Sequence, residues 1–374
     1  MKPTMRAYVL HGIGDLRFEE VPRPEPGPGE ALLRVTACGV CGSDLPRIYE
    51  KGTYRFPTIP GHEFAGIVEA VGEGADSALI GRAAAVFPLL PCFRCPSCAI
   101  GQYATCASYD YKGSRSDGAF AEYVAVPVWN LVPAPEGLSA EELAMAEPAA
   151  VALHALRRGG IEAGDRVFVS GAGPIGLMLA QWARALGASR VLLADVDDEK
   201  LVFARKLGFD DTINPLRENL DDWIRERTPG GVDLAVEGAG ASASWENCLK
   251  ASRPGGRVVL MGNPAGPMGL SQHGYWEMLR KQLHVVGTWN SDYAGVPEHP
   301  GNTAARQPPG DEVAEGNDWS SSLRAMAEGR LEVKPLVTHR VRLEELGAAI
   351  LLMKEKSAFS NKVMWTIPTE GANV

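Results

Sequence analysis

Four side chains near the start of the chain could perform metal-assisted chemistry together. They are the thiol of Cys41, the hydroxyl of Ser43, the imidazole of His62 and the carboxylate of Glu63, and a further carboxylate, Glu147, follows later. Thiolate, imidazole and carboxylate are the ligand types of a catalytic zinc ion. Any one of these residues alone could be an ordinary buried thiol or loop histidine. Together they predict a catalytic zinc site of Cys41, His62, Glu63 and Glu147, with Ser43 close enough to act on whatever the metal binds.

A second cluster of cysteines has the spacing of a structural metal site. Cys92, Cys95, Cys98 and Cys106 are spaced so that four thiolates can surround one tetrahedral ion. An iron–sulfur cluster and a redox dithiol are the alternatives. A bacterial ferredoxin motif would continue with a further cysteine followed by proline, and a redox pair does not need four cysteines. We therefore expect a structural zinc lobe over residues 88–110, in addition to the catalytic zinc.

A glycine-rich turn follows an apolar strand and opens a helix in the middle of the chain. The turn contains Gly171, Gly173, Pro174, Ile175 and Gly176, which form a G-x-G-x-x-G pattern. Its glycines allow the backbone to approach a pyrophosphate at the N-terminus of the helix. Asp195 ends the next strand, where a carboxylate binds the ribose hydroxyls of a dinucleotide. No arginine follows Asp195 to receive a 2′-phosphate, so NAD is preferred over NADP.

Other candidate contacts come from the ends of later strands, where the cofactor crosses a doubly wound sheet. Glu237 and Gly262 lie at such ends, although they could equally be ordinary turn residues. Thr288, Trp289 and Asn290 end the last strand and could border the nicotinamide or the substrate. Glu237, Gly262 and Thr288 are therefore candidate cofactor residues, and Trp289 and Asn290 are candidate substrate residues. Lys200, in the expected helix at 198–207, is a further candidate for the cofactor.

The composition predicts an ordinary globular protein without nucleic-acid or membrane partners. The chain has 374 residues, a hydrophobic content of 45% and a charged content of 22%, and this length favours two domains. The net charge of −9 argues against binding to nucleic acid or to an anionic membrane surface. No apolar stretch is long enough to cross a bilayer, and the first residues contain no signal sequence. We therefore expect a cytoplasmic protein.

Two patterns of secondary structure divide the chain. The first ~130 residues alternate apolar and polar positions between turn signals, which predicts the short strands of a β-barrel-like domain. A capping box at residues 139–142 opens a helical stretch that carries Glu147 and ends near residue 160. From residue 165 strands and helices alternate, which predicts a doubly wound parallel sheet. Its six strands are expected at 166–170, 191–194, 211–214, 232–236, 257–261 and 284–288.

The motifs occur in the order and spacing of a known family. The metal-ligand motifs around Cys41 and His62, the four-cysteine lobe and the glycine-rich turn make the chain resemble the zinc-dependent medium-chain dehydrogenases over nearly its whole length. The resemblance implies a GroES-like catalytic β-barrel domain, formed by residues 1–154 and 291–374, around a Rossmann NAD-binding domain at 155–290. Residues 291–318 are expected to form a long loop. The resemblance also implies a homodimer or a homotetramer.

The resemblance assigns roles to the site residues. It implies that one of the two glutamates binds zinc through water, or that the two exchange as the metal moves. Glu147 stands where classical alcohol dehydrogenases have a cysteine, which is similar to the polyol branch of the family. The implied chemistry is Lewis-acid activation of a substrate hydroxyl, proton removal that starts at Ser43, and hydride transfer to NAD. Asp44 is a candidate partner that orients His62.

Three strings of residues are most similar to the galactitol-1-phosphate dehydrogenase subfamily. They span residues 41–48, 88–93 and 113–118. The resemblance implies a sugar alcohol or its phosphate as the substrate, and a phosphate group needs cationic anchors. Arg47 and Arg115 are the candidates within these strings, although a surface or interlobe salt bridge would explain them equally well.

Three alternative functions remain open. An unphosphorylated polyol dehydrogenase of the sorbitol or iditol type has the same metal residues, and an L-threonine dehydrogenase has the same general scaffold. A zinc-free regulatory relative that binds a nucleotide would lack Cys41, His62 and Glu63, so their presence argues against it.

Some relatives pass the substrate proton to a histidine a few residues after the serine. Here Leu45 and Pro46 occupy that region, so any proton relay must take another route.

Overall fold

The computed structural model describes residues 3–264, 266–293 and 316–367. The chain divides into two compact units. Unit 1 contains Met1–Glu147, Asp292–Glu328 and Val337–Val374, and unit 2 contains Pro148–Ser291 and Gly329–Leu336. Most of the loop expected at residues 291–318 lies outside the described residues.

The division between the units falls inside helix α4 (Ala146–Arg158). Two segments that were expected in the catalytic domain, 148–154 and 329–336, therefore lie in unit 2, as does the single residue Ser291. The first is held by Trp182, whose Nε1 donates a hydrogen bond to the Ala149 carbonyl oxygen at 3.0 Å. The second is held by reciprocal hydrogen bonds between the Gln181 amide and the Glu332 backbone, at 3.0 and 2.8 Å.

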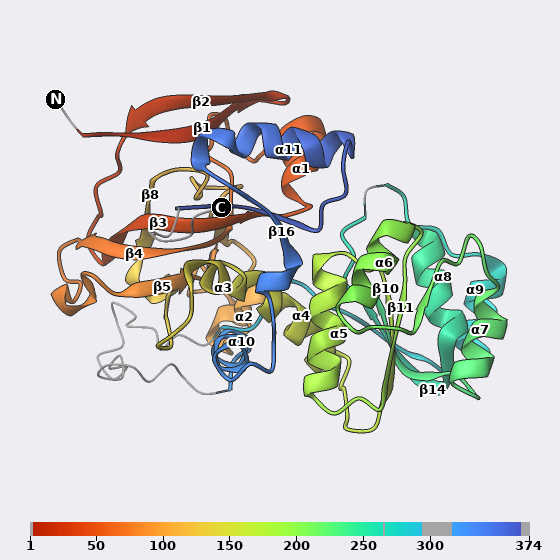
Figure 1. Ribbon diagram of the computed structural model, residues 1–374. Coiled ribbons are helices and arrows are strands. Elements are labelled where there is room, and N and C mark those ends of the chain that lie inside the picture. Colours follow the sequence, from red (N-terminus) through yellow and green to blue (C-terminus); the bar gives the residue numbers. More distant parts are fainter. Residues whose placement is uncertain (1–2, 265, 294–315, 368–374) are drawn as a thin grey trace. The chain divides into compact units, whose positions relative to one another are not determined.

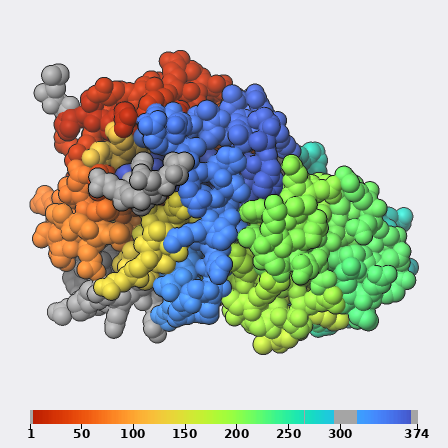
Figure 2. All heavy atoms as spheres, in the orientation of Figure 1, coloured from red at the N-terminus to blue at the C-terminus, as the bar shows by residue number. Residues whose placement is uncertain are grey.

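The largest element of unit 1 is a seven-stranded sheet with the order β16-β17-β3-β4-β5-β9, in which β8 also pairs with β3. Its strands are β3 (Glu30–Val40), β4 (Glu63–Val71), β5 (Ala83–Val86), β8 (Tyr123–Pro127), β9 (Leu131–Pro133), β16 (Val337–Val341) and β17 (Lys362–Thr366). β17 runs antiparallel to β3, so the last described strand completes a sheet that begins near the start of the chain. Figure 2 shows C-terminal residues (blue) against N-terminal ones (red) at the surface of this unit.

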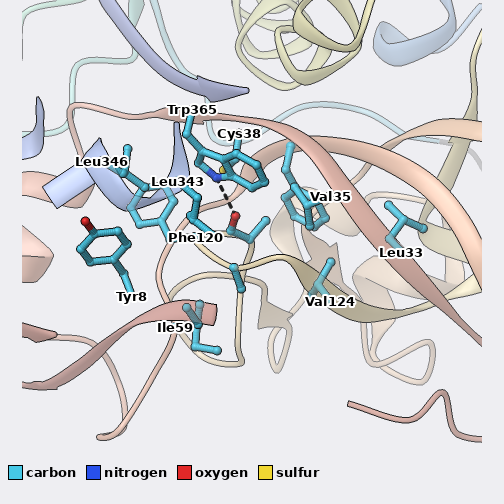
Figure 3. Close-up of a cluster of buried hydrophobic side chains, with 14 of the residues drawn as sticks. Tyr8, Leu33, Val35, Cys38, Ile59, Phe120, Val124, Leu343, Leu346 and Trp365 are labelled. Atoms are coloured by element: carbon cyan, nitrogen blue, oxygen red, sulfur yellow. Dashed lines mark hydrogen bonds between the residues drawn. The ribbon is translucent and has the colours of Figure 1, made fainter. Parts of the chain in front are cut away.

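The core of unit 1 joins this sheet to a hairpin of β1 (Thr4–Gly12) and β2 (Asp15–Pro22). Figure 3 shows Trp365 and Cys38 near Phe120 in this core. The Trp365 Nε1 donates to a backbone oxygen, that of Ala119, at 3.0 Å, so the buried indole has its polar atom satisfied. Truncation of a buried aromatic side chain of this kind costs about 3–5 kcal/mol.

Short elements connect the strands of unit 1. They are α1 (Asp44–Pro46), η1 (Arg47–Lys51), η2 (Ser77–Leu79), β6 (Leu89–Leu90), α2 (Pro96–Ala99), η3 (Tyr103–Thr105), β7 (Asp110–Tyr111), η4 (Val128–Asn130), α3 (Ala140–Ala144), α10 (Asp318–Ala327), η6 (Leu343–Glu345) and α11 (Leu346–Glu355). The capping box expected at Ser139 and Glu142 is confirmed. The helical stretch expected after it consists of two helices, α3 and α4, with Met145 between them.

Unit 2 contains a six-stranded parallel sheet with the order β12-β11-β10-β13-β14-β15. Its strands are β10 (Arg166–Ser170), β11 (Arg190–Ala194), β12 (Thr212–Ile213), β13 (Val232–Glu237), β14 (Ser252–Leu260) and β15 (His284–Gly287). The helices are α5 (Pro174–Ala185), α6 (Asp198–Lys206), α7 (Leu220–Arg227), α8 (Ser242–Ala251) and α9 (Gln272–Arg280), and η5 (Lys334–Leu336) belongs to the same unit. They lie on both faces of the sheet (Figure 1), which is the doubly wound arrangement expected.

Within the described residues, no helix combines the length and apolar character needed to span a membrane.

Candidate active site

Two adjacent strands bring three of the predicted metal ligands together. Cys41 directly follows β3, His62 directly precedes β4, and Glu63 is the first residue of β4. β3 and β4 are antiparallel neighbours with Gly39 opposite Glu63, so the end of one strand lies beside the start of the other. One ligand atom from each of Cys41, His62 and Glu63 lies within 4.8 Å of the others. This spacing and this donor set suit a single zinc ion.

A buried lysine pairs with the Glu63 carboxylate. Lys362 opens β17 and donates from Nζ to Glu63 Oε1 at 2.8 Å and to Oε2 at 2.6 Å. Burial alone would lower the pKa of Lys362, but the charges of Glu63 and Cys41 outweigh burial and raise it, so the ammonium form persists. Lys362 is absent from the sequence-based candidates. The one signal for it is a lysine at the start of an apolar strand.

Glu147 is buried near this group but is not part of it. Its Oε1 accepts a hydrogen bond from the Tyr111 hydroxyl at 3.1 Å, and the Tyr111 ring centroid lies 5.7 Å from that of His62. Burial raises the pKa of Glu147 to about 7, against the opposing charge of His62. Glu147 can therefore be protonated or charged near neutral pH, and a bound cation would favour the charged form. Tyr111 lies in a two-residue strand and carries no sequence motif.

Asp44 connects the end of β3 to the imidazole. Its side chain is fully buried, and its Oδ2 accepts a hydrogen bond from the Cys41 backbone N–H at 2.9 Å. Its Oδ1 lies 3.2 Å from His62 Nδ1, which is an ion-pair distance, and Nδ1 has no hydrogen-bond partner among the described residues. Because Asp44 faces Nδ1, Nε2 is the imidazole nitrogen left for a metal. This position fits the orienting role expected of Asp44.

The Ser43 hydroxyl lies between the Cys41 sulfur and the Arg47 guanidinium. Ser43 Oγ donates to Cys41 Sγ at 3.2 Å and accepts from Arg47 Nη1 at 2.8 Å. The same Nη1 donates to Asp44 Oδ1 at 3.3 Å. Arg47 was expected to anchor a phosphate, but two residues of the candidate metal site already engage its guanidinium.

Arg115 has different surroundings. Its Cζ lies 4.0 Å from the ring centroid of Tyr54 and 4.6 Å from that of Tyr109. In the part of the chain that the structure describes, no carboxylate forms an ion pair with it. Its backbone N–H donates to the Tyr111 carbonyl oxygen at 2.9 Å, which ties its loop to the strand that reaches Glu147. Stacking therefore holds the guanidinium while its N–H donors stay available.

The four predicted cysteines of the structural lobe converge. One sulfur from each of Cys92, Cys95, Cys98 and Cys106 lies within 4.8 Å of the others, and all four thiols are free. Backbone N–H donors of Ala107 and Cys98 lower the pKa of Cys95 to about 6, so this thiol ionises readily. Four convergent sulfurs with one favoured thiolate fit a tetrahedral zinc ion without an open position.

In unit 2 the glycine-rich turn joins β10 to α5. Gly171 has a φ of 117°, which favours glycine, and a side chain at Gly176 would overlap the Gly171 carbonyl oxygen. α5 begins at Pro174, so its first free N–H groups lie at this turn. Asp195, just after β11, accepts a hydrogen bond from the Ala172 N–H at 2.8 Å. The turn and the carboxylate therefore meet, as a dinucleotide site requires.

Two further cofactor candidates are already engaged within the protein. Lys200 Nζ lies 3.8 Å from Asp195 Oδ2. The Glu237 carboxylate accepts hydrogen bonds from the Ala239 and Gly240 N–H groups at 2.9 and 2.7 Å. These bonds stabilise the turn that directly follows Glu237. A side chain at Gly262 would overlap the Gly240 nitrogen, which explains the glycine there.

The residues after β15 present polar atoms that a ligand could satisfy. Thr288 Oγ1 and Asn290 Nδ2 are buried and have no hydrogen-bond partner among the described residues. Buried polar atoms are normally hydrogen-bonded, so these two atoms fit contact with a bound molecule. The Trp289 side chain between them in sequence is 54% exposed.

Comparison with known proteins covers both units. The family model of the alcohol dehydrogenase GroES-like domain matches residues 27–136, and that of the zinc-binding dehydrogenases matches residues 174–299. Galactitol 1-phosphate 5-dehydrogenase of Escherichia coli (strain K12) is 34% identical over 350 residues, which cover 92% of this chain and 95% of that protein. Sorbitol dehydrogenase of Homo sapiens is 32% identical over 357 residues, which cover 92% of this chain and 91% of that protein.

A solved structure extends the likeness to three dimensions. The crystal structure of galactitol-1-phosphate dehydrogenase from Escherichia coli matches with a TM-score of 0.85 and 33% identity, over 97% of this chain and 100% of that one. The expected architecture of a GroES-like domain with a Rossmann-type parallel sheet is thereby confirmed. The chain belongs to the zinc-binding dehydrogenases, the medium-chain alcohol dehydrogenase family, and is an oxidoreductase.

Proposed function

We propose that this enzyme oxidises a secondary hydroxyl of a sugar alcohol, or of a sugar-alcohol phosphate, to a ketose and transfers the hydride to NAD. The observation that carries the proposal is the convergence of Cys41, His62 and Glu63, with Ser43 Oγ 3.2 Å from the Cys41 sulfur. The Ser43 hydroxyl therefore lies beside the place where a substrate hydroxyl would approach the three ligands. From there it can accept the proton of the substrate hydroxyl.

Each residue of the catalytic site has a distinct role in this proposal. Cys41 and His62 hold zinc together with Glu63 or Glu147, and Asp44 keeps the imidazole oriented. When bound, zinc supplies a Lewis acid that makes a substrate hydroxyl more acidic. Ser43 receives the proton of that hydroxyl, and it needs a further acceptor because Leu45 and Pro46 offer none.

The four-cysteine lobe holds the second zinc ion in a structural role. Cys92, Cys95, Cys98 and Cys106 supply four sulfur ligands. A shell of four thiolates leaves no open position for a substrate or for water. This zinc therefore stabilises the lobe and takes no part in the reaction.

The nicotinamide cofactor binds at the glycine-rich turn of unit 2, and NAD is preferred over NADP. Gly173 leaves room for the pyrophosphate, Gly171 forms the turn and Gly176 allows the helix to pack against it, with Pro174 and Ile175 opening the helix. The Asp195 carboxylate suits the ribose hydroxyls, and Asp197 and Asp198 add negative charge that opposes a 2′-phosphate. Thr288 Oγ1 and Asn290 Nδ2 are unsatisfied donors that suit the cofactor or the substrate.

A phosphorylated substrate is favoured by Arg115. Its guanidinium is held between the rings of Tyr54 and Tyr109 and has no carboxylate partner among the described residues. A guanidinium presents paired N–H donors that match phosphate oxygens. The loop that carries Arg115 is bonded to Tyr111, which contacts Glu147 at the metal site. We therefore place the phosphate at Arg115 and not at Arg47.

The proposal also includes the oligomeric state of the enzyme and its location in the cell. β15 is the last strand on its side of the sheet, so its outer edge can pair with a second copy of the chain. We propose a homodimer or a homotetramer, and light scattering after gel filtration tests it. A cytoplasmic location stays a prediction from the composition.

The function is tested by initial rates of NAD reduction with zinc-loaded enzyme. The panel contains galactitol 1-phosphate, galactitol, sorbitol, xylitol and L-threonine. A preference for the phosphorylated substrate by orders of magnitude in kcat/KM is the expected result. Preference for a free polyol or for threonine would keep the metal chemistry and remove the phosphate site at Arg115. No NAD reduction with any of the five would contradict the proposed reaction.

A further inference from the structure

Arg47 makes a contact that a phosphate anchor does not need. It opens the short helix η1, directly after α1, and its Nη1 donates a hydrogen bond to Ser43 Oγ at 2.8 Å. The same nitrogen donates to Asp44 Oδ1 at 3.3 Å. The Arg47 side chain is only 26% exposed, and that of Asp44 is fully buried. The guanidinium is therefore fixed against the candidate metal site and is not extended into solvent.

This contact determines where the Ser43 hydroxyl hydrogen can point. A guanidinium has only donors, so the serine oxygen is the acceptor of the Arg47 bond. The serine hydrogen must then point away from Arg47. The acceptor it meets is the Cys41 sulfur, at 3.2 Å from Ser43 Oγ. Arg47 and Cys41 thus engage one lone pair and the hydrogen of Ser43, which leaves the second lone pair of Oγ to accept the proton of a substrate hydroxyl.

Asp44 makes the arrangement of these residues rigid. Its Oδ1 faces both Arg47 Nη1 and His62 Nδ1, at 3.3 and 3.2 Å. Its Oδ2 accepts the Cys41 backbone N–H at 2.9 Å. One buried carboxylate therefore fixes the guanidinium relative to the candidate ligands. The positive charge of Arg47 also lies near any negative charge that develops beside Ser43.

We propose that Arg47 is a positioning residue that holds Ser43 in its reactive orientation and favours negative charge on the substrate oxygen as its proton leaves. No proton passes to or from Arg47, because a guanidinium does not titrate in a protein. The inference rests on the proposed role of Ser43. It replaces the expectation that Arg47 binds the phosphate of the substrate.

The kinetic test compares Arg47→Met, Arg47→Lys, Ser43→Ala and the double variant Arg47→Met/Ser43→Ala. Loss of one charged hydrogen bond predicts a fall in kcat of about 10- to 100-fold in Arg47→Met. The KM should change little, and the factor should be the same for galactitol 1-phosphate and for a free polyol. Arg47→Lys should recover part of the rate, since it restores one cationic donor. The double variant should be no slower than Ser43→Ala, because the two residues act as one unit.

Lys51→Met is the matched control. Lys51 lies in the same helix η1, is exposed, and makes no contact with Ser43 in the structure. Its loss removes one positive charge from the same helix and should leave kcat unchanged. Circular dichroism of every variant shows whether a lost rate reflects lost folding.

A spectroscopic measurement tests the inference without turnover. Co²⁺ in place of zinc gives a visible band from the Cys41 thiolate, isolated as the difference from a Cys41→Ser sample. The hydrogen bond from Ser43 to this sulfur should alter the band. Arg47→Met and Ser43→Ala should therefore shift it in the same direction, and Lys51→Met should not.

The outcomes separate this inference from the proposed function. Unchanged kcat and an unchanged cobalt band in Arg47→Met, with Ser43→Ala impaired, would overturn the role of Arg47 alone. A rise in KM confined to the phosphorylated substrate would make Arg47 a phosphate anchor and also overturn it. Full activity in Ser43→Ala would instead overturn the role of Ser43 on which the inference rests.

Discussion

The Lys362 Nζ lies 2.6 Å from Glu63 Oε2 and 2.8 Å from Oε1, and both side chains are buried, at 3% and 1% exposure. The first residue of β17 thereby neutralises a carboxylate on the first residue of β4. The two residues are separated by 299 positions in the sequence. Lys362 therefore compensates the charge of Glu63 before any ion binds.

Removal of Lys362 should destabilise the protein strongly. Lys362→Met leaves the Glu63 carboxylate buried without its partner, and breaking a buried pair in this way costs about 3–5 kcal/mol. The double variant Lys362→Met/Glu63→Gln should recover much of the loss, because no buried charge remains unpaired. Thermal unfolding checks this, with the exposed Lys51→Met as the control. Equal stability of Lys362→Met and the wild type would contradict the account of the pair.

The two glutamates of the site should contribute unequally to zinc binding. Lys362 donates to both oxygens of Glu63, while Tyr111 donates to one oxygen of Glu147. Glu147→Gln should therefore weaken zinc binding at the catalytic site by at least about tenfold, and Glu63→Gln should weaken it less. Zinc content after dialysis against a graded chelator measures the difference. Loss of zinc in Glu63→Gln with retention in Glu147→Gln would reverse the assignment.

Arg115 should matter only for a phosphorylated substrate. Arg115→Met is expected to raise the KM for galactitol 1-phosphate by about 10- to 100-fold, because the charge-assisted bonds to phosphate are lost. The kinetics with a free polyol should stay as in the wild type. Arg55→Met is the control, since Arg55 lies on a neighbouring loop and pairs with Asp117 at 2.9 Å. An equal effect of Arg115→Met on both substrates would indicate a structural role for the stacked guanidinium.

Asp233 should make the stability of the protein depend on pH. Burial alone would raise its pKa, but hydrogen bonds from Arg166 and Arg253, at 2.9 and 2.6 Å, outweigh burial and lower it. Because the pKa of Asp233 is lower in the folded than in the unfolded protein, its charged form stabilises the fold at pH values above the unfolded pKa of about 4. This stability is lost as the pH falls through the folded pKa.

Asp233→Asn should therefore reduce stability by about 1–3 kcal/mol at neutral pH. The gap in melting temperature between variant and wild type should narrow as pH falls below about 4. Asp210→Asn, at an exposed position of the same unit, is the control. A gap that stays constant between neutral and acidic pH would contradict the assigned pairing.

The convergence of most candidate metal ligands could be predicted because short loops and adjacent strands determine their proximity. Cys41 and His62 flank neighbouring strands, and the four cysteines of the lobe lie within one short segment, so ligand type and spacing were sufficient evidence. Lys362 has no such signal, because its partnership with Glu63 depends on how β17 joins the sheet. The sequence also does not indicate that Tyr111 belongs to the site, since this residue lies in a two-residue strand without a motif.

Side-chain partners explain the other differences. Arg47 and Arg115 look equivalent in sequence, and only the packing around them separates a guanidinium bonded to Ser43 from one stacked on Tyr54. The unit boundary within α4 was also beyond prediction, because the helix pattern continues through it. Periodicity identifies the helix but does not show which unit each part of it packs against.

The most direct test of the central claim is the rate of NADH formation from galactitol 1-phosphate by zinc-loaded Cys41→Ser, with NAD affinity measured on the same sample. The account predicts that turnover is lost while NAD binding is retained, because Cys41 lies in the metal site and the glycine-rich turn lies in unit 2. Full turnover by Cys41→Ser would contradict the claim that the site of Cys41, His62 and Glu63 carries out the oxidation.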